Sequence, residues 1–176
     1  MPSTTFNIEE RFNEFASASA SAEASAFPTV ETNPYRLQVT KYEGKEFNDH
    51  PYAHLTVSVQ NEDGSRKLAT VFADITWVEK RYPDGKLIKE FKLYDQLTRA
   101  LYPDLTVEQR TQKDLGQVLA DATAYPVSGF VTEKFQTIDA EGKKKWVSPK
   151  TADEKVGYRS KGFKAGNFIA NFSQLR

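Results

Sequence analysis

Alternation of apolar and polar side chains is the feature of this sequence that most restricts its fold. Residues 35–40 alternate strictly, and residues 55–60 repeat the pattern. A period of two is typical of strands that bury one face. The Asn-Glu-Asp-Gly sequence at 61–64 favours a tight turn, and an apolar, β-branched run follows over 68–78. These segments predict an antiparallel hairpin in a mostly β domain.

Helical periodicity interrupts the strands in the middle of the chain. Apolar residues recur every three or four positions over residues 91–101, and Pro103 ends this helix. Residues 106–109 match a capping box, which predicts a second helix over 107–122.

Strand patterns return in the last third of the chain. A long strand is predicted over 127–138, followed by a turn at 139–142 and a returning strand over 143–147. We then expect a charged loop, and a closing strand within residues 157–172.

This order of elements predicts a β-barrel of five or six antiparallel strands, with one or two helices between strands three and four. The oligonucleotide/oligosaccharide-binding (OB) barrel has this layout. Closing a barrel removes exposed sheet edges. An open α+β sheet is the alternative that fits the same pattern.

The sequence divides into an appendage, residues 1–32, and a domain, residues 33–176. In the appendage, apolar residues near helical spacing predict a short helix within residues 6–15. An Ala/Ser-rich stretch at 16–26 then predicts a flexible linker. Formal charge is zero overall, but residues 1–34 hold one basic and five acidic residues. Residues 129–176 hold ten basic and five acidic residues, so the basic excess is confined to the C-terminal third.

Motifs for enzymatic chemistry are missing. The chain lacks a Gly-rich phosphate loop, Gly-x-Ser-x-Gly and His-Glu-x-x-His, and it contains no cysteine. His50 and His54 are four residues apart, but a strand separates such residues by roughly 13 Å, too far to share a metal ion. Asp74 interrupts an apolar strand, and an outward-facing polar position explains it better than catalysis does. We therefore expect no enzyme, metal or cofactor.

Basic residues interleaved with aromatic ones suggest a binding surface instead. Single-stranded nucleic acid exposes bases that stack on aromatic rings and phosphates that Lys and Arg neutralise. On a strand, Arg159, Lys161 and Phe163 would share a face. The candidate stacking and phosphate-contacting residues are Trp77, Lys80, Arg81, Tyr82, Lys134, Lys143, Lys144, Lys145, Trp146, Tyr158, Arg159, Lys161, Phe163 and Lys164.

A second interpretation accounts for the same residues. Trp77, Phe163, Phe168 and Phe172 would be core residues, and the lysines after the hairpin turn would be a solvated loop. The chain would then be a structural or adaptor protein-interaction module. A continuous basic stripe along one groove favours nucleic acid, whereas scattered lysines favour the adaptor.

The layout of residues 33–172 resembles single-stranded DNA-binding proteins encoded by tailed bacteriophages. The resemblance lies in the run 33–60, the hairpin to Trp77, the 91–101 helix and the closing 158–172 segment. It implies an OB barrel that coats single strands during phage replication and recombination. Many such proteins end in an acidic tail that recruits replication enzymes, but this chain ends in Ser-Gln-Leu-Arg.

The resemblance also sets expectations about partners and location. Single-stranded DNA is the expected ligand, and residues 1–32 are the candidate contact for a replication or recombination protein, or for the chain's own basic groove. A homo-oligomer fits the same class. No apolar run is long enough to span a membrane and no signal peptide is apparent, so we expect a location in the cytoplasm of a bacterial host.

Overall fold

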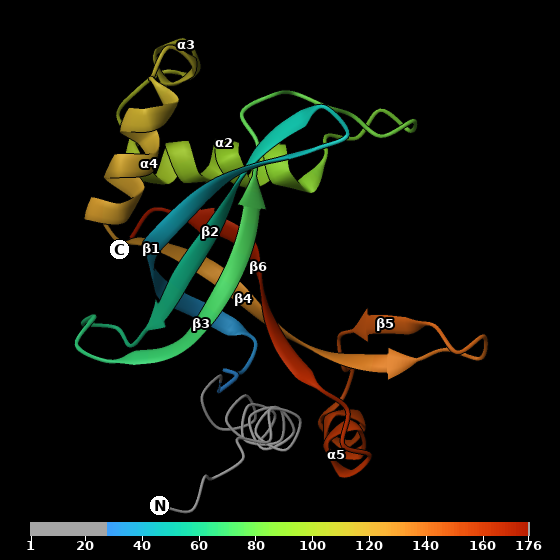
Figure 1. Ribbon diagram of the computed structural model, residues 1–176. Helices are drawn as coiled ribbons and strands as arrows, with labels where there is room; N and C mark the ends of the chain where they lie inside the picture. The colour runs from blue at the N-terminus through green and yellow to red at the C-terminus, as the bar shows by residue number, and fades with distance from the viewer. Residues whose placement is uncertain (1–27, 176) are drawn as a thin grey trace, which may run out of the picture.

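The computed structural model describes residues 28–175, which form six strands and four helices (Figure 1). In chain order the elements are β1 (Asn33–Phe47), β2 (His50–Gln60), β3 (Lys67–Ile75), α2 (Lys89–Leu101), α3 (Val107–Thr111), α4 (Leu115–Ala124), β4 (Val127–Ile138), β5 (Lys144–Val147), α5 (Ala152–Ser160) and β6 (Ala165–Ser173). The predicted helix within residues 6–15 and the linker at 16–26 lie outside the described residues.

All strand pairs are antiparallel, and β1 connects the two halves of the sheet. Its first residues, Asn33–Leu37, pair with β4, while Arg36–Phe47 pair with β2. β2 then pairs with β3. β4 carries β5 near its C-terminal end and β6 on its other edge. The mostly β architecture that the alternation predicted is confirmed.

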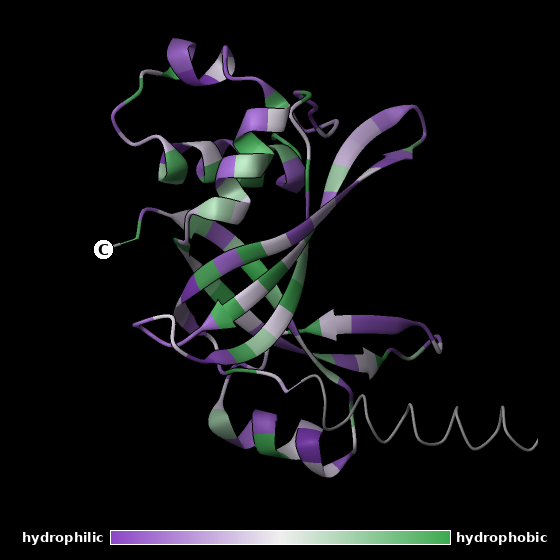
Figure 2. Ribbon diagram, turned by 60° about the vertical axis from the view of Figure 1, so that its left-hand side comes forward, coloured by the Kyte–Doolittle hydropathy of each residue, from purple (hydrophilic) through white to green (hydrophobic). Residues whose placement is uncertain are grey.

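The inward-facing side chains of these strands form the core. It contains Leu37 and Val39 of β1, Leu55 of β2 and Val71 of β3, with Ile169 from β6 on the opposite side. Apolar residues form the green bands along the strands in Figure 2. Burial of alternate residues is the physical basis of the period-two pattern.

The barrel does not close, so the expected OB-type closure is not supported and the open α+β alternative fits. No hydrogen-bonded ladder joins β3 to β6 within residues 28–175. Helix α2 packs against both strands. Gln96 of α2 accepts a hydrogen bond from the Phe172 backbone N–H of β6 at 3.2 Å. A side chain therefore satisfies a donor on the β6 backbone, and α2 takes part in covering the open side.

The β1–β2 hairpin is longer than predicted because its turn was missed. Asn48 and Asp49 both have positive φ, 49° and 58°, and connect the two strands directly. Two consecutive left-handed residues are the signature of a type I′ turn, which matches the twist of a hairpin. Asn and Asp tolerate this conformation better than other non-glycine residues.

The single helix predicted over 107–122 is instead two. The capping box is confirmed, because the Thr106 hydroxyl accepts from the Gln109 N–H and the Gln109 side chain accepts from the Thr106 N–H. Asp114 then caps a new helix by accepting from the Gly116 N–H at 2.7 Å. The second cap separates α3 from α4 and explains the break.

The charged segment predicted as a loop forms helix α5. Thr151 caps it by accepting from the Glu154 N–H. Gly157–Ser160 was predicted to begin the closing strand, but these residues are the last turn of α5, and β6 begins at Ala165. The strand prediction failed because the apolar spacing of this short, exposed helix is weak and no residue of it is fully buried.

Candidate nucleic-acid interface

The outer face of β4, β5 and β6 brings together aromatic and basic side chains. Trp146 of β5 meets the Phe168 ring of β6 edge-on, with centroids 5.1 Å apart. The Lys134 ammonium of β4 lies 5.3 Å from the centroid of the same Phe168 ring. All three side chains are partly exposed. We call Lys134, Trp146 and Phe168 the aromatic–basic face.

Strand register explains this grouping. Trp146 pairs with Gln136, two residues along β4 from Lys134, and Lys134 pairs with Gly166. Residues two apart on a strand share a face. Gly166 leaves room for the indole, because a Cβ there would lie 2.9 Å from the Trp146 ring. The glycine therefore permits Trp146 to lie across β6.

Additional positive charge borders the aromatic–basic face. Lys144 is two residues from Trp146 on β5 and shares its side of the sheet. Lys89 lies at the start of α2, close enough to Lys134 to be affected by its charge. Burial lowers the pKa of Lys89 most, and repulsion from the Lys134 charge lowers it further. A lysine pair that repels in the free protein gains stability when a phosphate lies between its members.

The remaining lysines of the β4–β5 hairpin are solvated. Lys143 lies in the exposed turn and contacts Glu141 at 3.4 Å. Lys145 pairs with Thr137 and alternates with Lys144, so it faces the other side of the sheet. Of the predicted residues, the structure therefore places Lys134, Lys144 and Trp146 on one face.

The predicted cluster at 158–164 does not form a strand with a shared face. The Tyr158 ring packs against Phe135 of the core and against Phe163, with centroids 5.5 and 5.8 Å apart. Its hydroxyl donates to Glu154, which raises the Tyr158 pKa. Arg159 points its guanidinium to within 3.5 Å of Glu133. These side chains anchor α5 to the sheet, whereas Lys161 and Lys164 are exposed.

The predicted cluster after β3, which consists of Trp77, Lys80, Arg81 and Tyr82, does not form one surface either. Trp77 packs against the core and lines a hollow of about 410 Å³ with Phe91 and Tyr94 of α2, so it is not part of the aromatic–basic face. The Arg81 guanidinium donates hydrogen bonds to the Glu79 carboxylate at 2.8 Å and to the Gly85 carbonyl at 2.9 Å. Lys80 and Tyr82 are exposed in the loop.

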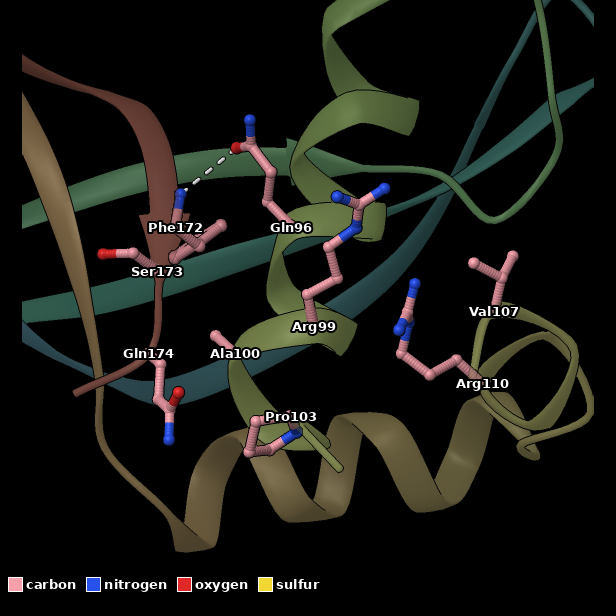
Figure 3. Close-up of a pocket in the computed structure, with 9 residues that line it drawn as sticks. All are labelled: Gln96, Arg99, Ala100, Pro103, Val107, Arg110, Phe172, Ser173 and Gln174. Carbon is pink, nitrogen blue, oxygen red and sulfur yellow. Dashed lines mark hydrogen bonds between the residues drawn. The ribbon is translucent and has the colours of Figure 1, made fainter. Parts of the chain in front are cut away.

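A second hollow, of about 660 Å³, opens beside it between α2, α3 and the end of β6 (Figure 3). Arg99 and Arg110 extend into it from the two helices. Arg99 forms an ion pair with Asp95 at 3.1 Å, and the Arg110 guanidinium donates a hydrogen bond to the Leu105 carbonyl. Sequence reasoning missed both arginines because they adjoin no aromatic residue in the chain and meet only through the helix packing.

A further cluster lies on the outer face of β2 and β3. The His54 ring stacks on Phe72 with centroids 5.4 Å apart, and its Nδ1 lies 2.6 Å from the Asp74 Oδ1. Asp74 faces outward, as predicted, and is directly opposite His54 in the register. Phe72 is 51% exposed. His50 does not join this cluster, and residues 28–175 contain no group of three potential metal-ligating His, Asp or Glu side chains.

Comparisons with family models, with curated proteins and with solved structures give no match. None of the helices in residues 28–175 is both long and apolar enough to cross a membrane.

Proposed function

We propose that this chain binds single-stranded DNA with little sequence preference and without catalysis. The observation that carries the proposal is the aromatic–basic face. Trp146 and Phe168 present partly exposed rings there, and Lys134 lies over one of them. Base stacking on such rings stabilises binding by about 1–3 kcal/mol per base and tolerates every base.

The charges around this face suit a phosphate backbone. Lys89, Lys134 and Lys144 come from α2, β4 and β5, so their grouping depends on the fold and not on adjacency in sequence. A binding groove responds to its local field, so the zero net charge of the chain does not oppose this function. By its resemblance to phage proteins, the chain would coat single strands during replication or recombination.

The test is a fluorescence titration of the full chain with oligo-dT and with duplex DNA of equal length, at low and high salt. Trp146 should be quenched by the single strand, more weakly at high salt. Trp77→Phe should keep this quenching and Trp146→Phe should remove it. If no oligonucleotide binds at low salt, or if the signal comes from Trp77 alone, the proposal is wrong.

A second candidate function, a protein-interaction module, is favoured by the two hollows beside α3. Val107 and Arg110 of this short helix line both hollows, and Val107 is 60% exposed. Trp77, which lines one of them, would then contact a partner protein. An Arg110→Glu variant separates the two functions, because it should leave oligonucleotide affinity unchanged if the aromatic–basic face is the binding surface.

A further inference from the structure

The β1–β2 hairpin extends beyond the rest of the sheet as a two-stranded arm. Pairing of β1 with β4 ends at Leu37, and pairing of β2 with β3 begins only at Ala53. Every residue from Thr40 to Asp49 is exposed. Figure 1 shows the arm projecting past α2, and Figure 2 shows that its surface is mostly hydrophilic. An isolated two-stranded hairpin is marginally stable at best, so pairing with a further strand would stabilise this arm.

The outer edge of the arm is open for pairing. From Lys41 to Phe47, β1 forms ladder bonds only with β2, and no other backbone hydrogen bond in residues 28–175 involves this stretch. An unpaired edge is a template for another strand. Two aromatic side chains on it are exposed, Tyr42 by 42% and Phe47 by 70%.

We propose that this edge pairs with the same edge of a second copy, antiparallel about a two-fold axis at Gly44. Gly44 would then face Gly44 of the second copy, and Glu43 would face Lys45. Farther out, Tyr42 would face Glu46 and Lys41 would face Phe47. A two-fold interface uses the same patch on both copies, so each of these contacts occurs twice except the one on the axis. This proposal is independent of nucleic-acid binding.

Charge complementarity favours this register over its two neighbours. Directly opposed residues lie on the same face, and opposite charges there stabilise the pairing of two strands. Glu43 and Lys45 pair twice in the proposed register. The neighbouring antiparallel registers place Glu43 against Glu43 or Lys45 against Lys45, and like charges directly opposite are destabilising.

Cysteine cross-linking tests the axis directly. The chain contains no cysteine, and a Cβ added at Gly44 would meet no atom within 4 Å. Residues directly opposite on antiparallel strands have Cα atoms about 4.5–5.5 Å apart, which suits a disulfide. Gly44→Cys should therefore form a disulfide-linked dimer under mild oxidation. Glu62→Cys, in the exposed β2–β3 turn, is the matched control and should cross-link far more slowly.

Charge exchange tests the register. Glu43→Lys places a second ammonium group directly opposite Lys45, so sedimentation velocity should show a loss of dimer at a concentration where the original chain is dimeric. The double variant E43K/K45E restores opposite charges and should restore the dimer. Both residues are exposed, so circular dichroism should show an unchanged fold.

The proposal is wrong if Gly44→Cys cross-links no faster than the control, or if E43K/K45E fails to recover the dimer that Glu43→Lys loses. A full chain that sediments as a monomer at all concentrations would also overturn it. If the charge variants change oligonucleotide affinity but not sedimentation, the arm contacts nucleic acid and not a second copy.

Discussion

Lys155 of α5 places its Nζ atom 2.8 Å from Oε1 of Glu133, a carboxylate that is only 2% exposed. Thr29 donates to the other carboxylate oxygen at 3.1 Å, and Glu31 contacts Lys155 at 3.3 Å. These contacts connect β4 to α5 and to the segment before β1. Residues 29–32, placed in the appendage by the sequence, thus contact the folded domain.

Replacing Lys155 with methionine should destabilise the fold by about 3 kcal/mol, because it leaves the Glu133 charge buried with a more distant guanidinium as its remaining basic partner. Urea unfolding followed by circular dichroism measures this. Lys67→Met, at an exposed position, is the control and should change the free energy of unfolding little. Equal effects of the two variants would contradict the role of the ion pair.

Alkaline pH should weaken the same contact. The nearby Glu133 carboxylate raises the pKa of Lys155 above its ordinary value of 10.5. A base with a raised pKa stabilises the folded state fully below the unfolded pKa, and this contribution disappears as the pH rises through the folded pKa. The difference in urea midpoint between the original chain and Lys155→Met should therefore be constant near neutral pH and shrink above about pH 10.5. A difference that grows with pH would exclude this coupling.

Phe168→Leu should lower affinity for single-stranded DNA by about tenfold, since loss of one stacked base costs about 1–3 kcal/mol. Phe163→Leu is the matched control. Its ring packs against Tyr158 beside the core, so this substitution should lower stability and leave affinity unchanged. Fluorescence anisotropy of a labelled oligonucleotide measures both affinities. If Phe163→Leu lowers the affinity and Phe168→Leu does not, the interface lies beside α5 and not on the aromatic–basic face.

Lys134→Ala should reduce the salt dependence of binding. Each phosphate contact to a single strand contributes about −0.7 to the slope of log K against log salt concentration, so the slope should become shallower by about that amount. Arg81→Ala removes a guanidinium that is already engaged by Glu79 and should leave the slope unchanged. Titrations at several salt concentrations provide the comparison, and a change only for Arg81 would refute the placement of the site.

Asp49→Gly should stabilise the β1–β2 hairpin by about 0.5–1 kcal/mol, because glycine adopts positive φ without strain and follows Asn in favoured type I′ turns. Glu62→Gly, in the β2–β3 turn, lacks this benefit, because positive φ occurs there at Gly64 and not at Glu62. Thermal unfolding of both variants gives the test. A destabilised Asp49→Gly would show that the Asp49 side chain itself supports the turn.

Elements with strong local signals could be predicted from the sequence. The strands within 35–40 and 55–60 lie where alternation placed them, because one face of each is buried, and the strand over 127–138 lies where β propensity placed it. The turns at 61–64 and 139–142 each contain a glycine with positive φ. Helix α5 could not be predicted, because its contacts with Phe135 and Glu133 come from a strand distant in the chain.

The candidate site was only partly predictable for a related reason. Lys134 and Trp146 were selected for their residue types, which is a local property. Phe168 was assigned to a core, because only pairing of β4 with β6 shows that it faces outward beside them. Tyr158, Arg159 and Phe163, which lie close together in the sequence, instead anchor α5 to the sheet.

The sequence by itself determined most of the strand segments, the turns at 61–64 and 139–142, and the basic excess of the C-terminal third, since these depend on residues close in the chain. Tertiary structure decided whether the barrel closes, which rings are exposed and which charges are paired. Each of these depends on register and helix packing between distant segments. A shift of one residue in the β4–β6 register would turn Phe168 inward and expose Ile169, and local sequence alone cannot set that pairing.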